Sequence, residues 1–179
     1  MLYKTQGIIV KKVNSGEFDR LLTVYTKDFG KILLKAKSVR KNQSKLKGHL
    51  ELFLYSHLMI APAKGFDIIT GAETIESFPF LHRNLSSLAS AYYLAELTDK
   101  LFVGPEKDER IWQLILFNFR DLNKKKQNSK TLINNFENKL VELLGYGNKQ
   151  KDATFFIEPF LDGKINSRYF LQKVAYLLE

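Results

Sequence analysis

The chain has 179 residues, of which 45% are hydrophobic and 26% are charged, a composition typical of folded proteins and not of disordered chains. Lysine and arginine outnumber aspartate and glutamate by 28 to 19, and the formal charge of +9 favours partners that carry negative charge, such as nucleic acid or an anionic surface. Because the chain contains no cysteine, disulfide bonds, thiolate metal sites and cysteine nucleophiles are all excluded.

The N-terminal segment MLYKTQGIIVKKV contains a three-residue apolar run followed by two lysines. It lacks the apolar core and the small-residue cleavage site of a signal peptide. No segment approaches the ~20 apolar residues that a membrane-spanning helix needs. We therefore expect a cytoplasmic protein without a membrane partner.

The first 78 residues show short β-like segments that are separated by glycine, proline and asparagine breaks. Tight turns join most of these segments, and one longer basic connection separates the third from the fourth. Five strands are predicted, at 3–13, 20–27, 30–38, 49–60 and 66–76. This arrangement favours a small Greek-key barrel of the OB type.

From residue 79 onward, apolar residues recur at helical spacing. The sequence therefore predicts an α+β protein, with an OB-fold nucleic-acid-binding domain at 1–78 followed by a mainly helical domain at 79–179. An apolar stripe from Leu85 to Leu101 predicts a first helix that Asn84 or Ser86 caps. Further helices are predicted at 107–123, at 130–144 with Gly145 as its stop, and at 167–179, with a short irregular insertion at about 146–166.

The excess positive charge lies mainly in the β half. Residues 1–78 hold 13 basic and 7 acidic residues, whereas residues 79–179 hold 15 and 12. The stretch KAKSVRKNQSKLKGH, residues 35–49, contains six basic residues and no acidic one. A basic segment of this kind is either a solvated loop or the surface on which a polyanion lies.

Strand alternation predicts which side chains of the basic segment lie on the same face. In a strand at 30–38, Lys31, Leu33, Lys35 and Lys37 share one face, and apolar residues share the other. Neighbours on one face lie roughly 6.6–7 Å apart, which is close to the spacing of phosphates on an extended single strand. The lysines thus form a candidate track for a nucleic-acid backbone, although lysines are also the usual outward residues of a half-buried strand.

Single-strand binding also uses aromatic rings on which bases stack. In the strand predicted at 49–60, Phe53 and Tyr55 share a face with Glu51 and His57, opposite a face of leucines. This mixed face is either a stacking platform or a surface that the helical domain covers. Phe53 and Tyr55 are therefore possible base-stacking residues.

No catalytic or metal site is visible in the sequence. The three histidines, His49, His57 and His82, lack the spacing and the supporting carboxylates of metal ligands. Glu17 and Asp19 lie two residues apart beside an arginine, which is more typical of a turn and an ion pair than of an acid/base pair. No phosphate-binding loop and no nucleophile elbow occurs. We expect neither a metal, nor a cofactor, nor enzymatic activity.

Several motifs follow one another in order over the N-terminal part of the chain. They are Gly16-Glu17 followed by Asp19-Arg20-Leu21, Thr26 with Phe29-Gly30-Lys31, the basic connection ending in Ser44-Lys45-Leu46-Lys47-Gly48, and Leu50 to Phe53. This ordered set resembles the RecO family of bacterial DNA-repair proteins. A second match, FENKLVELLGYG at 136–147, resembles a helix end of the form F-E-x-x-L-L-x-x-x-G-Y. The resemblance therefore reaches into both halves of the chain.

The resemblance implies a nucleoid-associated recombination mediator whose OB-fold binds single- and double-stranded DNA. Such proteins anneal complementary strands and, with RecR and the single-stranded-DNA-binding protein as partners, help RecA to load. Carried over residue by residue, the DNA-facing positions are Arg20, Lys31, Lys35, Lys37, Arg40, Lys41, Lys45 and Lys47.

The sequence also departs from the family pattern. Many relatives place a four-cysteine zinc module after the G-Y helix end, whereas this chain continues without any cysteine, so contacts that depend on that module are in doubt. Two other functions suit the same charge and barrel. One is an RNA-binding or translation-related OB-fold module, and the other is an adaptor whose basic face binds acidic peptides.

Overall fold

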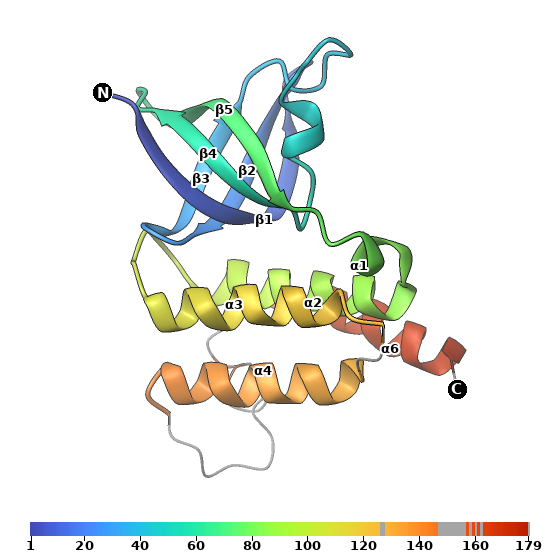
Figure 1. Cartoon of the computed structure of the whole chain (residues 1–179). Helices are drawn as coiled ribbons and strands as arrows, with labels where there is room; N and C mark the ends of the chain where they lie inside the picture. The colour runs from blue at the N-terminus through green and yellow to red at the C-terminus, as the bar shows by residue number, and fades with distance from the viewer. Residues whose placement is uncertain (126–127, 147–156, 158, 160, 162, 179) are drawn as a thin grey trace. The chain divides into compact units, whose positions relative to one another are not determined.

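The computed structural model describes residues 1–125, 128–146, 157, 159, 161 and 163–178 (Figure 1). The chain divides into two compact units. The barrel unit comprises Met1–Ser77 and Val103–Asp108, and the helical unit comprises Phe78–Phe102 and Glu109–Glu179. A closed N-terminal barrel followed by a helical region confirms the predicted α+β fold class.

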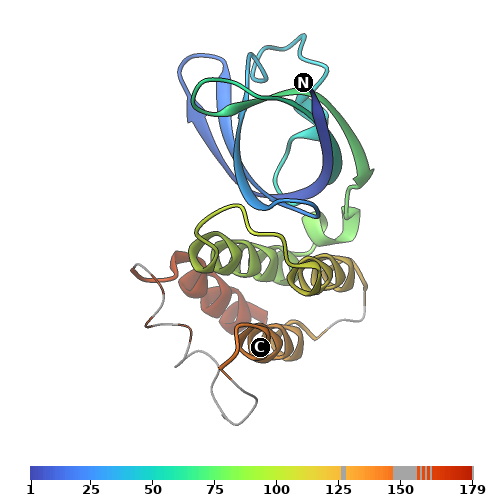
Figure 2. The same cartoon turned by 90° about the vertical axis from the view of Figure 1, so that its left-hand side faces the viewer.

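The barrel consists of five strands in the order β1-β2-β3-β5-β4, and Figure 2 shows how they close into a ring. The β3–β5 pair is parallel and the other neighbours are antiparallel. This is the topology of the five-stranded OB-fold. The strands are β1 (Tyr3–Ser15), β2 (Asp19–Thr26), β3 (Gly30–Ala36), β4 (Tyr55–Ala61) and β5 (Asp67–Glu76).

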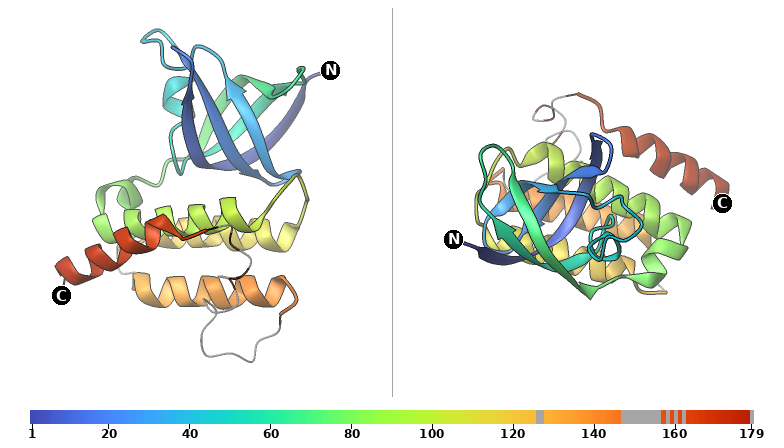
Figure 3. Two further views of the ribbon diagram at one scale, coloured as in Figure 1. Left: turned by 180° about the vertical axis from the view of Figure 1, so that it is seen from behind. Right: turned by 90° about the horizontal axis from the view of Figure 1, so that it is seen from above.

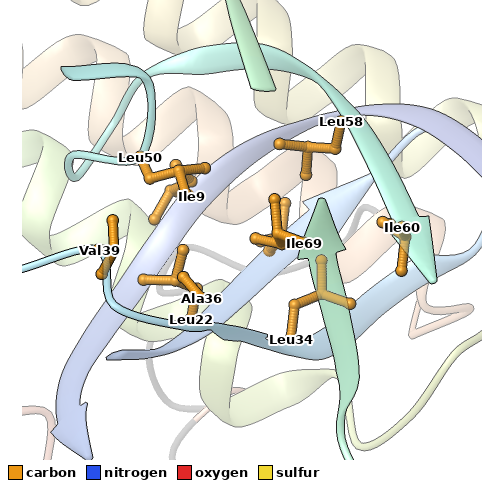
Figure 4. Close-up of a cluster of buried hydrophobic side chains, with 10 residues drawn as sticks. Ile9, Leu22, Leu34, Ala36, Val39, Leu50, Leu58, Ile60 and Ile69 are labelled. Carbon is orange, nitrogen blue, oxygen red and sulfur yellow. The ribbon is translucent and has the colours of Figure 1, made fainter. Parts of the chain in front are cut away.

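The barrel core is formed by the inward residues of all five strands. In β3, Leu34 and Ala36 are buried while Leu33 is exposed, so the predicted alternation holds along this strand. The basic connection adds Val39 and Leu50, which are both fully buried. Figure 4 shows these side chains meeting inside the barrel with Ile9, Leu22, Leu34, Ala36, Leu58, Ile60 and Ile69.

The predicted fourth strand is wrong at its N-terminal end. Residues Lys47–His49 form a short 3-10 helix, η1, and β4 begins only at Tyr55. Between them, Phe53 adopts a left-handed backbone with φ of 65°, and its N–H donates to the Ile9 carbonyl at 2.8 Å. Because the chain turns at Phe53, strand alternation does not run from residue 49 to residue 60.

The helical unit contains α1 (Pro79–Arg83), α2 (Leu85–Leu101), α3 (Glu109–Leu122), α4 (Ser129–Leu143) and α6 (Asn166–Leu178). The Asn84 side chain accepts from the Ser87 N–H at 2.9 Å, so Asn84 is the predicted cap of α2. Gly145 follows α4 with φ of 89°, as expected of a helix stop. Helix α6 packs against α2 (Figure 3). None of the described helices is long and apolar enough to cross a membrane.

Two parts of this unit differ from the expectation or lie beyond it. The short helix α1 was not predicted, because five residues are too few to show helical periodicity. The irregular insertion expected at about 146–166 falls largely outside the described residues.

The connection between α2 and α3 belongs to the barrel unit. Residues Val103–Asp108 group with the strands, although the sequence placed them in the helical domain. The backbone of Glu106 lies against Gly30, so close that a β-carbon at Gly30 would meet the Glu106 carbonyl oxygen at 2.0 Å. Gly30 also has φ of 66°. Both its conformation and its neighbour therefore require glycine at this position.

Candidate nucleic-acid interface

The connection after β3 carries the largest concentration of positive charge in the barrel unit. We call residues 37–47 the basic loop; it runs from the end of β3 to the first residue of η1. Within the part of the chain that the structure describes, none of its basic side chains has a carboxylate within ion-pair distance. These side chains are Lys37, Arg40, Lys41, Lys45 and Lys47, all exposed except the half-buried Arg40.

The first end of the basic loop is fastened to the turn between β1 and β2. Asp19 Oδ1 accepts a hydrogen bond from the Ser38 N–H at 2.8 Å, which supports the left-handed backbone of Ser38, with φ of 52°. The Arg40 N–H donates to the Phe18 carbonyl at 2.9 Å, and Arg40 Nη1 donates to the Glu17 carbonyl, also at 2.9 Å. These partners are neutral carbonyls, so they do not neutralise the charge of Arg40.

Directly after the basic loop, His49 fastens the chain to β4 and β5. The Thr74 N–H of β5 donates to His49 Nδ1 at 3.2 Å, and Ser56 of β4 donates its hydroxyl to the His49 carbonyl at 2.9 Å. Inside the loop, Lys41, Ser44 and Lys47 each donate a backbone N–H to the carbonyl three residues earlier.

These bonds, together with the buried Val39, hold the basic loop in one conformation. A loop whose backbone is ordered in advance loses less conformational entropy when it binds a ligand. The basic loop is therefore a preorganised cationic surface, suited to an extended polyanion.

Lys35 belongs to the predicted track but has a partner. Its Nζ lies 3.1 Å from Asp19 Oδ2, and the side chain is 32% exposed. The hydrogen bond from the Ser38 N–H, and then the contact with Lys35, hold the pKa of Asp19 below its ordinary value. The sequence shows no acid between residues 31 and 48, but folding brings Asp19 to this strand from β2.

Arg20 is more strongly committed to a partner within the protein. Its Nη1 donates to Glu51 Oε1 at 2.9 Å, and only 15% of the side chain is exposed. Lys12 pairs with the other oxygen of the same carboxylate. Burial alone would raise the pKa of Glu51, but the hydrogen bonds from Lys12 and Arg20 outweigh it and hold the pKa below its ordinary value. This geometry gives Arg20 a supporting role in the barrel wall.

Lys31 lies at the far end of the track, opposite Tyr25 in the β2–β3 register. Burial raises the pKa of Tyr25 above its ordinary value, and the nearby carboxylates of Asp108 and Glu106 raise it further. The Lys31 end of β3 therefore lies close to two negative charges. The other basic residues of the track and the basic loop, from Lys35 to Lys47, follow Lys31 along the chain.

The two predicted stacking residues are buried. Phe53 is 1% exposed and Tyr55 is 6% exposed, and the Tyr55 hydroxyl donates to Gln6 Oε1 at 2.6 Å. A ring without an exposed face cannot stack on a base, so this part of the prediction fails. The cause is the turn at Phe53, which redirects the side chains that strand alternation placed on the surface. Within the described ranges, no group of three potential ligand side chains forms a metal site.

Comparison with known proteins covers both units. Residues 1–78 match the family model described as "Recombination protein O N terminal", and residues 82–154 match "Recombination protein O C terminal". The chain belongs to the RecO family.

Relatives named DNA repair protein RecO agree with this assignment. The protein from a strain of Dehalococcoides mccartyi is 41% identical over 144 residues, which is 80% of this chain and 56% of the relative. The Roseiflexus protein is 34% identical over 145 residues, covering 81% and 50%. The Acetivibrio thermocellus protein is 30% identical over 143 residues, covering 80% and 57%. The RecO-family chain thus spans about half the length of the curated relatives it matches.

Several residues that carry the RecO resemblance have structural tasks. Asp19 orders the basic loop, Arg20 pairs with Glu51, and Gly30 accommodates the backbone of Glu106. In the second motif, Glu137 is 6% exposed and accepts a hydrogen bond from the Tyr93 hydroxyl of α2. These motif residues thus stabilise each unit from within. The exposed lysine and arginine side chains of the basic loop remain as the candidate DNA contacts.

Proposed function

We propose that this RecO-family chain is a non-enzymatic recombination mediator in DNA repair, which binds single- and double-stranded DNA and promotes the annealing of complementary strands. The observation that carries the proposal is the basic loop. Its five cationic side chains lack carboxylate partners among the described residues, and hydrogen bonds hold the chain at the start of the loop and two residues after its end.

The chemistry of the basic loop suits backbone contact without base specificity. Lysine and arginine neutralise phosphates and release the counterions that these phosphates had condensed, so affinity falls steeply with salt. Lys35 extends the surface along β3, where a phosphate would compete with Asp19 for its ammonium group. We assign direct phosphate contact to Lys35, Lys37, Arg40, Lys41, Lys45 and Lys47, and assign support of the barrel wall to Arg20.

Annealing needs no catalytic residue on such a surface. Two complementary strands repel each other through their phosphates, and this repulsion falls when both lie against one fixed array of positive charges. By family membership we extend the proposal to assistance of RecA loading, with RecR, RecA and the single-stranded-DNA-binding protein as partners.

The test is a fluorescence anisotropy titration of labelled single-stranded DNA at several salt concentrations. For the wild-type chain, the logarithm of the binding constant should fall with the logarithm of salt concentration by ~0.7 for each phosphate contacted. Replacement of Lys35, Lys37, Arg40 and Lys41 together by alanine should flatten this slope. No binding at low salt, or an unchanged slope in the variant, would remove the basic loop from the proposal.

Two further measurements separate this proposal from the other functions. Unlabelled RNA should displace labelled single-stranded DNA no better than unlabelled DNA of equal length does, because a preference for RNA requires contacts to the 2′-hydroxyl. Strand annealing should be faster with the wild-type chain than with the four-residue variant, both with and without the single-stranded-DNA-binding protein. Retention of acidic-peptide binding by a variant that no longer binds DNA would indicate an adaptor instead.

A further inference from the structure

The turn between β1 and β2 presents an exposed aromatic ring. Phe18 follows Gly16, whose left-handed backbone with φ of 65° forms the turn. The Phe18 side chain is 38% exposed, whereas the apolar side chains inside the barrel are almost fully buried. Burial of a phenylalanine side chain stabilises a protein, so a ring that remains partly in water gives up part of that gain.

The ring of Phe18 lies at the edge of the basic loop. Lys41 Nζ is 5.2 Å from the ring centroid, within the range of a cation–π contact. The Phe18 carbonyl accepts from the Arg40 N–H at 2.9 Å, so the same residue also anchors the loop through its backbone. One cationic side chain thus lies over the exposed ring, and the backbone of the neighbouring Arg40 is bonded to the same residue.

A simpler explanation is that Lys41 only shields the ring from water. Lysine side chains often cover apolar surface with their methylene groups while the ammonium remains solvated. However, 38% of Phe18 stays exposed with Lys41 already in contact, so the lysine does not complete the burial. Part of Phe18 therefore remains open to a ligand.

We propose that Phe18 is a stacking site for one unpaired nucleobase of a single strand that lies on the basic loop. In OB-folds the loop between the first two strands is one of the segments that contact oligonucleotides. Non-specific single-strand binders combine a basic groove with aromatic rings, and this barrel offers both at one turn. The inference rests on the proposed function, because a base reaches Phe18 only if its backbone lies on the basic loop.

The site differs in kind from the phosphate contacts. A base inside a duplex has both faces covered by its neighbours, so Phe18 should contribute to single-strand binding and not to duplex binding. Stacking also releases no counterions, so loss of the ring should lower affinity without changing the salt slope. Phe53 and Tyr55 cannot replace Phe18, because both are buried.

The experiment compares two labelled strands of equal length and charge, one of oligothymidylate and one of abasic sites. Phe18→Leu keeps apolar bulk but removes the aromatic face, and Phe18→Trp enlarges that face. The matched control is Phe29→Leu, because Phe29 is 37% exposed in the same unit but follows the opposite end of β2. Thermal melts of each variant establish that the barrel remains folded.

We expect Phe18→Leu to weaken oligothymidylate binding by about fivefold to a hundredfold, with affinity for the abasic strand and the salt slope unchanged. Phe18→Trp and Phe29→Leu should bind oligothymidylate at least as well as the wild type. The stacking site would be overturned if Phe18→Leu bound oligothymidylate as tightly as the wild type does. It would also be overturned if this variant lost affinity equally for both strands. If neither strand binds the wild-type chain, the proposed function itself fails, which is a distinguishable result.

Discussion

The carboxylate of Asp19 joins the start of β2 to the turn after β3, since its Oδ1 accepts from the Ser38 N–H at 2.8 Å and its Oδ2 lies 3.1 Å from Lys35 Nζ. The Asp19 side chain therefore orders the basic loop and also neutralises the adjacent Lys35. These two effects have opposite consequences for DNA binding, and substitutions can separate them.

Asp19→Asn should strengthen single-stranded DNA binding. The amide keeps an oxygen that accepts from Ser38, but it loses the charge that competes with phosphate for Lys35, so the contact of Lys35 with phosphate becomes more complete. The salt slope should then steepen by up to ~0.7. Asp19→Ala should instead remove the hydrogen bond from the Ser38 N–H, and faster amide hydrogen exchange of Ser38 would measure this loss.

The control for this prediction is Asp28→Asn. It makes the same change of charge in the turn after β2, where Asp28 accepts from the Thr5 hydroxyl at 2.8 Å. If Asp28→Asn steepened the slope as much as Asp19→Asn, the effect would come from net charge, and the specific role of the Asp19–Lys35 pair would be wrong.

Arg20 and Lys47 should give opposite results. Arg20→Ala removes a hydrogen bond to the half-buried Glu51, which should lower the free energy of unfolding of the barrel by about 1–3 kcal/mol while the salt slope stays unchanged. Lys47→Ala removes an exposed side chain, so stability should stay unchanged and the slope should become flatter. Denaturant titrations and anisotropy measure the two quantities. A flatter salt slope in the folded Arg20→Ala variant would mean that Arg20 contacts phosphate, which contradicts its assignment as a supporting residue.

Gly30→Ala should destabilise the barrel unit more than Gly16→Ala. Both glycines are left-handed, with φ of 66° and 65°, so both substitutions carry the backbone cost of about 1–2 kcal/mol. Only Gly30 faces the Glu106 backbone, whereas nothing lies within 4 Å of a β-carbon at Gly16. We expect a total loss of about 2–5 kcal/mol at Gly30. Equal losses in denaturant titrations would show that the Glu106 contact contributes nothing.

Glu96 should make the anchoring of α6 dependent on pH. Its carboxylate accepts from the Asn166 N–H, the Ser167 N–H and the Ser167 hydroxyl at 2.9, 2.7 and 2.6 Å. Burial alone would raise the pKa of Glu96, but these hydrogen bonds hold it below the ordinary value of 4.5. Because the folded-state pKa is lowered, the stabilisation is present above about pH 4.5 and is lost as pH falls through the folded-state value.

Amide hydrogen exchange in α6 tests this dependence. Glu96→Gln should lower the free energy of opening of α6 by about 1–2 kcal/mol at pH 7, and this effect should decrease as the pH is lowered from 4.5 towards 3. The control is Glu142→Gln, which removes an exposed carboxylate that pairs with Lys139 at 2.9 Å. An equal effect of Glu96→Gln at pH 7 and at pH 3 would mean that its charge does not hold α6.

Local patterns in the sequence were sufficient to predict most of the strands and helices. Apolar alternation located β1, β2, β3 and β5 to within a few residues, and helical spacing with an Asn84 cap and a Gly145 stop located α2 and α4. These features depend on residues that are close together in the chain, which is why a single sequence predicts them.

Long-range features could not be obtained in this way. The pairing of Arg20 with Glu51 and the packing of Glu106 on Gly30 join segments that are far apart in the sequence. The left-handed turn at Phe53 occurs at a residue type that rarely adopts that conformation, so alternation assigned the exposed ring to Phe53 instead of Phe18. The turn formed by residues 16–18 was foreseen from Glu17 and Asp19, but its contact with the basic loop was not.

The most direct test of the central claim compares two variants that lose the same charge. One replaces Lys37, Lys45 and Lys47 of the basic loop by alanine, and the other replaces Lys4, Lys27 and Lys130, which are equally exposed and lie elsewhere. If the basic loop binds the phosphate backbone, the first variant should flatten the salt slope for single-stranded DNA by ~2, and the second should leave it close to the wild-type value. Equal slopes for the two variants would contradict the claim that DNA lies on the basic loop.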